Sequence, residues 1–230
     1  MPQVDTVVDV GCDHGYLEEL IFKTGKAKFV IATDISEKSL EKTKIRAKKL
    51  NLNNIEFVCA DGLQFKSQRK SNLAIIAGIG GVETANILKN NKIEDVTEFI
   101  LVPVQNSVYV RKFLIDEKYE VIYDETLFER GKYYSVIYCK KSNKTNIKSY
   151  RFGISDLNNL GEDFERFVNR ELKNLQFLDK LDVNKVDAEK QEYKKQLEQI
   201  KEKIKCNQQF NNHRRQKFIE NNPKSTYHNS

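Results

Sequence analysis

The sequence predicts an α/β fold around a mostly parallel sheet, because apolar runs alternate with helix-like segments and the alternation ends in a hairpin. Five runs rich in β-branched residues lack the polar alternation of a half-exposed strand. This pattern is typical of parallel strands that helices cover on both faces. The predicted strands are residues 6–10, 29–33, 55–60, 73–77 and 99–104.

Helical patterns fill the gaps between these runs. Ser36 can cap the second helix, and Glu37 lies in its positive first turn. Two further strands are separated by a turn that contains Gly131, which predicts an antiparallel hairpin. The helices are expected near residues 16–23, 37–50, 82–90 and 108–117, and the hairpin strands at 119–127 and 133–139.

A second, helical part is expected after the sheet. Residues 142–148 are polar without periodicity, so we place the end of the sheet domain at residue 141. Two apolar stripes then recur at helical spacing, with a turn expected at 182–187. We expect an antiparallel coiled-coil hairpin within residues 142–205, or packing of the stripes onto the sheet, and a basic, mobile tail over 206–230. The stripes are Phe164, Val168, Leu172 and Leu175, then Tyr193, Leu197, Ile200 and Ile204.

Composition limits the classes of function. The four cysteines lie far apart without a Cys-x-x-Cys pair, which predicts neither a zinc cluster nor a disulfide framework and favours a cytoplasmic location. No apolar run reaches the roughly 20 residues that span a bilayer, and no leader is expected. Residues 142–230 hold 18 Lys or Arg against 13 Asp or Glu. This excess suits a solvated helix surface or an acidic polymer such as RNA.

A glycine loop follows the first strand, in the sequence Asp9-Val-Gly-Cys-Asp-His-Gly-Tyr16. Gly11 and Gly15 permit a sharp turn and a close approach of a ligand to the backbone. Because position 13 is Asp, the loop is not the Gly-x-Gly-x-x-Gly of dinucleotide sites, which disfavours a phosphate ligand. S-adenosylmethionine is a phosphate-free ligand whose cationic amino-acid part suits carboxylates.

Two more carboxylates fall at successive strand ends. Asp34 can accept hydrogen bonds from both ribose hydroxyls, and Asp61-Gly-Leu63 can bracket an adenine edge, although either Asp alone could be a helix cap or turn residue. Together they predict S-adenosylmethionine binding. The predicted cofactor residues are Asp9, Gly11, Cys12, Gly15, Asp34, Ile35, Asp61, Gly62, Leu63 and Gly78.

The fourth strand runs into Ala77-Gly-Ile-Gly-Gly-Val82. Amino-methylating enzymes usually carry Asn or Asp followed by two prolines here. The glycines offer a flat backbone surface for a planar base, or they only allow close packing. We predict substrate contacts at Gly80, Gly81 and Gln105.

Several motifs together resemble the bacterial tRNA adenine-N1 methyltransferases that modify adenosine 22 of the D-arm. The resemblance implies a Rossmann-like S-adenosylmethionine-dependent methyltransferase fold, with a seven-stranded sheet whose last strand inserts between its neighbours, and a helical appendage. Members usually begin with an extra N-terminal helix, whereas this sequence starts almost at the first strand, and it has Asp34 where many have Glu. The motifs are Asp9-Val-Gly-Cys-Asp-His-Gly-Tyr-Leu17, Ala77-Gly-Ile-Gly-Gly81, Gln105-Asn106, Asp124-Glu-Thr-Leu-Phe-Glu129, Tyr133-Tyr-Ser-Val-Ile137 and Phe152-Gly153.

The resemblance implies methyl transfer to N1 of an adenosine in tRNA, with no metal. Adenine N1 carries a free lone pair, so alignment of a flipped-out base replaces base catalysis. Asp13 is the first candidate to stabilise the cationic product, or it caps the next helix. His14 and Tyr16 can contact the base or a phosphate, and Asn106 can hold the base edge or cap a helix.

Two other functions stay open on the sequence. The domain could methylate a protein or a small molecule, with the coiled coil serving oligomerisation. It could also be a non-catalytic RNA-binding or scaffold protein that retains the cofactor pocket.

Overall fold

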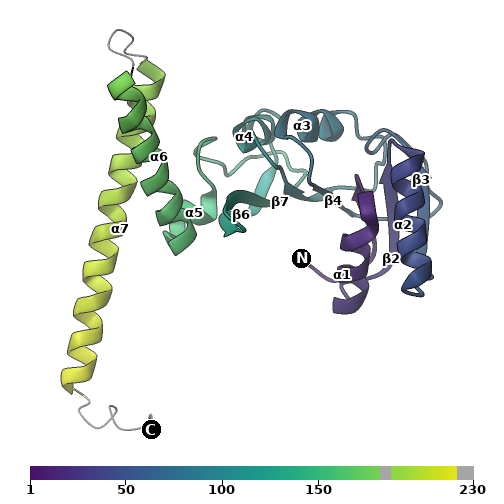
Figure 1. Cartoon of the computed structure of the whole chain (residues 1–230), viewed down its shortest axis with the longest axis horizontal. Coiled ribbons are helices and arrows are strands. Elements are labelled where there is room, and N and C mark those ends of the chain that lie inside the picture. The colour runs from purple at the N-terminus through teal and green to yellow at the C-terminus, as the bar shows by residue number, and fades with distance from the viewer. Residues whose placement is uncertain (182–187, 222–230) are drawn as a thin grey trace. The chain divides into compact units, whose positions relative to one another are not determined.

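The chain divides into two compact units, Met1–Asn158 and Asn159–Ser230. The computed structural model describes residues 1–181 and 188–221 (Figure 1). The first unit holds the sheet and the second holds two long helices.

Seven strands of the first unit form one sheet in the order β3-β2-β1-β4-β5-β7-β6. β1 to β5 are parallel, whereas β7 lies antiparallel between β5 and β6. This insertion of the last strand confirms the order that the family resemblance implies. The strands are β1 Val4–Val10, β2 Ala27–Asp34, β3 Ile55–Cys59, β4 Leu73–Ala77, β5 Glu98–Val102, β6 Glu120–Glu129 and β7 Lys132–Lys140.

Helices cover both faces of the sheet, because successive residues of a strand point to opposite faces. Val7 of β1 packs in a cluster with Ile21 of α1. Val8, the next residue, packs on the other face in a cluster with Leu88 of α3 and Leu114 of α4. The helices are α1 Tyr16–Thr24, α2 Glu37–Lys49, α3 Gly81–Lys89 and α4 Ser107–Asp116.

The strands and helices expected in residues 1–141 are all present, with ends shifted by at most two residues. Ser36 caps α2 as expected, because its side chain accepts a hydrogen bond from the backbone N–H of Ser39 at 3.3 Å. The expectation of burial on both faces is wrong for β3, whose residues are half-buried or exposed. β3 forms an outer edge of the sheet, so one side of it has no neighbouring strand.

The first unit extends to Asn158, later than the expected boundary at residue 141. Polar residues after β7 bind the outer strand β6 instead of solvent. The Asn146 side chain accepts from the N–H of Val121 at 2.8 Å and donates to its carbonyl at 2.7 Å. Asp156, in α5 (Ile154–Asn159), accepts from the N–H and hydroxyl of Thr126 at 2.8 and 2.7 Å. This segment therefore covers an otherwise open sheet edge.

The second unit contains α6 (Glu162–Leu181) and α7 (Ala188–Asn221), which contact each other. Tyr193 of α7 donates to Glu171 at 3.3 Å, and Gln208 donates to Glu165 at 2.8 Å. Most residues of the two expected apolar stripes are buried. Their buried members are Phe164, Val168, Leu172 and Leu175 on α6, and Leu197, Ile200 and Ile204 on α7.

Residues 206–221, expected as part of a mobile tail, instead continue helix α7. Residues 222–230 and the turn expected at 182–187 lie outside the described residues. Among the helices that the structure describes, none has the length and apolar character to cross a membrane.

Candidate active site

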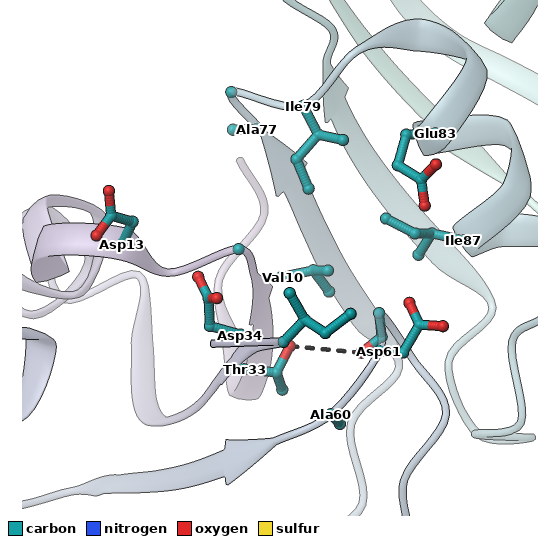
Figure 2. Close-up of a pocket in the computed structure, with 14 residues that line it drawn as sticks. Val10, Asp13, Thr33, Asp34, Ala60, Asp61, Ala77, Ile79, Glu83 and Ile87 are labelled. Carbon is teal, nitrogen blue, oxygen red and sulfur yellow. Dashed lines mark hydrogen bonds between the residues drawn. The ribbon is translucent and has the colours of Figure 1, made fainter. Parts of the chain in front are cut away.

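A cavity of about 610 Å³ opens at the carboxyl ends of the parallel strands, beside the point between β1 and β4 where the strand order reverses. Ligands of open α/β sheets bind at such a switch point. Figure 2 shows the cavity, with Asp34 and Asp61 at neighbouring strand ends. The predicted cofactor residues that line it are Gly11, Asp34, Ile35, Asp61, Gly62 and Gly78.

The loop after β1 turns sharply at Gly11, which has φ +79°. A Cβ added to this residue would lie 3.0 Å from the Ile79 side chain. Any larger residue there would be strained and crowded. The backbone N–H groups of Gly11 and Cys12 donate to the carbonyl of Thr33 at 2.8 and 3.0 Å. The Thr43 hydroxyl of α2 donates to the Cys12 carbonyl at 3.1 Å. The loop is thus fixed before any ligand arrives.

Carboxylates dominate the charge of the cavity. Its 14 lining residues include four acids and no Lys, Arg or His. Such a wall attracts a cationic ligand and repels a phosphate. The four acids are Asp13, Asp34, Asp61 and Glu83.

Asp34 and Asp61 each use one carboxylate oxygen within the protein. Oδ1 of Asp34 accepts from the N–H of Ser36 at 2.8 Å. Oδ2 of Asp61 accepts from the Gln64 amide at 2.9 Å. These bonds orient each carboxylate and leave its second oxygen for hydroxyl or amine groups of a ligand.

Asp9 is not part of the cavity wall, and only 3% of its surface is exposed. Burial raises its pKa well above the usual range, and the nearby carboxyls of Glu18 and Asp34 raise it further. Burial also raises the pKa of Glu18, whose carboxylate oxygens have no hydrogen-bond partner in the described part of the chain. Two buried carboxyls this close favour a shared proton. The sequence pattern did not single out Glu18.

Three other predicted cofactor residues do not line the cavity. Cys12 and Leu63 are buried in the two apolar clusters. Gly15 has φ +69° and packs against α2, where an added Cβ would lie 3.1 Å from Thr43. All three pack within the protein, next to the loops that line the cavity.

Of the predicted catalytic residues, Asp13 alone lines the cavity. Its carboxylate accepts from the Lys42 ammonium at 3.0 Å, and this hydrogen bond lowers its pKa. His14 (φ +71°) and Tyr16 follow it on the rim, with ring centroids 6.0 Å apart. Helix α1 begins after Gly15 without a side-chain cap, so Asp13 does not cap it.

Asn106 and the predicted substrate residues lie at the junction of α3 with the loop after β5. The N–H of Gly81 donates to the Gln105 carbonyl at 2.9 Å. A Cβ on Gly81 would lie 2.2 Å from the Asn106 carbonyl oxygen, so the close-packing interpretation describes this glycine. Gly80 is less crowded, with the Gln105 amide at 3.7 Å. Asn106 precedes α4 with φ +58° and makes no side-chain cap.

Sequence patterns did not predict the contribution of α3. Glu83 and Ile87 of this helix complete the cavity opposite Asp34 (Figure 2). Glu83 lies in the first turn after the glycines that follow β4. Because this junction follows the carboxyl end of β4, the sequence could have placed Glu83 at the same edge of the sheet as Asp34 and Asp61.

Comparison with known proteins agrees with this geometry. The family described as "Methyltransferase domain" matches residues 1–137. The chain belongs to this methyltransferase family. The described part of this methyltransferase contains no cluster of three or more His, Cys, Asp or Glu residues that could hold a metal ion.

Named relatives of this methyltransferase confirm the resemblance seen in its motifs. A putative tRNA methyltransferase of Mycoplasma genitalium is 29% identical over 140 residues, which cover 60% of this chain and 63% of the relative. The tRNA (adenine(22)-N(1))-methyltransferase of Bacillus subtilis is 31% identical over 140 residues, covering 60% and 59%. The matched region therefore spans about three fifths of each curated relative.

A solved structure matches more of the chain. The m1A22 tRNA methyltransferase of B. subtilis superposes with a TM-score of 0.69 at 25% identity, covering 89% of this chain and 92% of that one. The likeness thus reaches beyond the 137 residues of the methyltransferase domain.

Proposed function

We propose that this methyltransferase transfers a methyl group from S-adenosylmethionine to N1 of an adenosine in tRNA, the adenosine at position 22 of the D-arm. The observation that supports this cofactor is the wall of four carboxylates at the switch point of the sheet. The carboxylates attract the positively charged sulfonium and ammonium groups of S-adenosylmethionine, whereas they repel the negatively charged phosphates of a dinucleotide.

The residues present fit the proposed cofactor. The free oxygen of Asp34 suits ribose hydroxyls, and Asp61 with the exposed side chain of Ile35 suits the adenine ring. Gly11 and Gly78, both with φ +79°, keep side chains out of the space above the loops. Nothing lies within 4 Å of a Cβ built on Gly78, so that side of the cavity is open to a second substrate.

The names of the relatives support tRNA as the substrate. Both curated relatives are named as tRNA methyltransferases, and the B. subtilis protein is named for adenosine 22. The structural match to the B. subtilis enzyme covers 89% of this chain. We therefore assign the helical unit of α6 and α7 to tRNA binding rather than to self-association.

S-adenosylmethionine, when bound, supplies an electrophilic methyl carbon on a positively charged sulfur. The protein contributes alignment, since the N1 lone pair of adenine needs no base to attack that carbon. Transfer would break the S–CH₃ bond as the N1–CH₃ bond forms, so that S-adenosylhomocysteine would leave as a neutral thioether and the positive charge would stay on the adenine ring. Asp13 is held ionised by Lys42 at the rim, and its carboxylate stabilises the ring cation.

The other rim residues hold the flipped-out base. His14 and Tyr16 follow Asp13 and offer a ring to stack on or a donor for a phosphate. Asn106 and Gln105 are exposed beside Gly80 and offer amide groups to the base edge. Each of these side chains acts on the substrate by position, and Asp13 adds charge.

Mass spectrometry of tRNA nucleosides tests the proposal directly. Unmodified tRNA incubated with the full chain and S-adenosylmethionine should gain 1-methyladenosine, and a transcript with adenosine 22 replaced by guanosine should gain none. Methylation of the replaced transcript would overturn the assigned position. Absence of methylated nucleoside, with methylation of a protein or a small molecule in a parallel assay, would overturn tRNA as the substrate.

Calorimetry tests the cofactor site separately. Asp34→Ala should weaken S-adenosylmethionine binding at least tenfold, about 1.4 kcal/mol, because the carboxylate oxygen aimed at the ribose is lost. Asp5→Ala, which removes an exposed surface carboxylate paired with Lys28, serves as the matched control. Equal affinities of the Asp34→Ala variant and the wild type would show that the ribose lies elsewhere.

A further inference from the structure

Helix α2 is strongly basic, although the first unit as a whole is not. Its 13 residues hold six Lys or Arg and only two Glu. Four of the cations, at spacings of four, four and three, share one side of the helix. We call Lys38, Lys42, Arg46 and Lys49 the α2 stripe. At a rise of 1.5 Å per residue the stripe extends for roughly 16 Å.

The α2 stripe borders the rim of the cofactor cavity. Lys42 donates to Asp13, a cavity residue, at 3.0 Å. The Arg46 guanidinium lies 4.0 Å from the centroid of the Tyr16 ring, and Arg46 is held there by hydrogen bonds to Glu19. The stripe and the rim thus form one continuous surface of the first unit.

Tyr16 is a preformed stacking surface on this rim. Arg46 covers one face of its ring, yet 64% of the residue is exposed. An exposed aromatic ring fixed by an arginine presents its other face to any planar group. Unpaired bases of RNA are such groups, and they are recognised by stacking on aromatic side chains.

The ends of the stripe have unneutralised charge. Lys42 and Arg46 are balanced by Asp13 and Glu19. Lys38 and Lys49 are exposed and form no ion pair with any residue in the described ranges. Exposed lysines can bind the phosphates of an RNA strand, while a base of the same strand stacks on the neighbouring aromatic ring.

Resting on the proposed tRNA substrate, we infer that the α2 stripe and Tyr16 form a second tRNA-binding surface, separate from the helical unit. Phosphates of the tRNA bind at Lys38 and Lys49, and an unpaired base stacks on Tyr16. This surface sets the target base at the cavity rim, because Asp13 joins the stripe to the cavity wall. The first unit therefore contributes to tRNA affinity as well as to catalysis.

The helix supplies its own matched control. Lys44 and Lys48 belong to the same helix but lie on another side, where Lys44 pairs with Glu41 at 3.6 Å. Lys38→Gln with Lys49→Gln and Lys44→Gln with Lys48→Gln both remove two positive charges from α2. Only the first pair removes charge from the α2 stripe.

Fluorescence titration of the full-length chain with tRNA at several salt concentrations tests the charges. The Lys38→Gln/Lys49→Gln variant should bind roughly tenfold more weakly, and its log Kd against log salt should be less steep by about two. The Lys44→Gln/Lys48→Gln variant should keep the wild-type slope. Equal slopes in the two variants would overturn the inference, even where the wild-type protein still methylates tRNA.

Tyr16 variants test the stacking. Tyr16→Leu should weaken tRNA binding about tenfold or more, while Tyr16→Phe, which keeps the ring, should bind as the wild type does. Both should bind S-adenosylmethionine normally, since Tyr16 does not line the cavity. Equal loss in both variants would show that the hydroxyl rather than the ring contacts the tRNA and would overturn the stacking. Failure of the wild-type protein to bind tRNA at all would overturn the proposed function and this surface together.

Discussion

Gly81→Ala places one methyl group at the tightest contact near the site. The new Cβ would lie 2.2 Å from the Asn106 carbonyl oxygen and 2.9 Å from that of Gln105. Ordinary contact starts at 3.4 Å, so the loop after β5 and the start of α3 must separate by about 1 Å. That movement also strains the hydrogen bond from the Gly81 N–H to Gln105.

The stability cost follows from this contact. Overpacking of a buried position costs about 1–3 kcal/mol, and a weakened hydrogen bond adds about 1 kcal/mol. The reduced freedom of the unfolded chain returns roughly 0.4–1 kcal/mol. A net loss of about 2 kcal/mol should lower the melting temperature by roughly 4–8 °C in a protein of this size.

The catalytic cost should be larger than the stability cost. Gln105 and Asn106 are proposed to hold the base, and a displacement of about 1 Å at such groups can lower the rate by about 100-fold. S-adenosylmethionine affinity should change little, because Gly81 and Asn106 do not line the cavity. Single-turnover methylation of tRNA and calorimetry with the cofactor measure the two effects separately.

Gly80→Ala is the control for this prediction. It makes the same chemical change one residue earlier, where the nearest atom to a Cβ is the mobile Gln105 amide at 3.7 Å and φ is −66°. Its melting temperature should stay within about 2 °C of the wild-type value. A Gly81→Ala protein as stable and as active as the wild type would refute the packing argument.

Three further predictions concern the rim and the domain boundary. Asp13→Asn should lower the single-turnover methylation rate far more than the affinity for tRNA, because it removes the negative charge of the carboxylate that Lys42 keeps ionised. Equal methylation rates of the variant and the wild type would exclude Asp13 from the mechanism. A chain ending at residue 158 should fold and bind S-adenosylmethionine, whereas one ending at 141 should melt at a lower temperature, since it loses the segment bound to β6; equal melting would contradict that packing. Burial raises the pKa of Asp156 to about 6, so the folded state favours the protonated acid, and the contribution of Asp156 to stability should fall as pH rises from about 4 to above 6. Across that pH range, the free energy of unfolding of Asp156→Asn should rise by roughly 2–3 kcal/mol relative to that of the wild type, as measured by denaturant titrations. If the unfolding free energies of the two proteins changed in parallel with pH, the raised pKa would be wrong.

The sequence alone determined the order of strands and helices and the edge at which the site lies. Apolar runs and turn residues are local features, and they placed every strand and α-helix of residues 1–141 to within two residues, although not the 3-10 helix Asp13–Gly15 in the glycine loop. Carboxyl ends of parallel strands share one edge, so Asp34 and Asp61 could be brought together without knowledge of their distance. Three of the four acids of the cavity wall, Asp13, Asp34 and Asp61, belong to the predicted site, whereas Glu83 does not.

Only the tertiary structure decided which polar residues are buried and what they contact. Asp9 was expected to touch the ligand, yet it is buried beside Glu18 and does not line the cavity. Residues 142–158 were expected to leave the first unit, yet their side chains bind β6. The spacing of the basic residues of α2 is a local feature of the sequence, but the contact of Lys42 with Asp13, which sets that side of the helix beside the cavity, forms only in the folded chain. A polar residue is equally satisfied by water or by a protein partner. Which of the two it meets depends on residues distant in sequence, and local patterns do not contain that information.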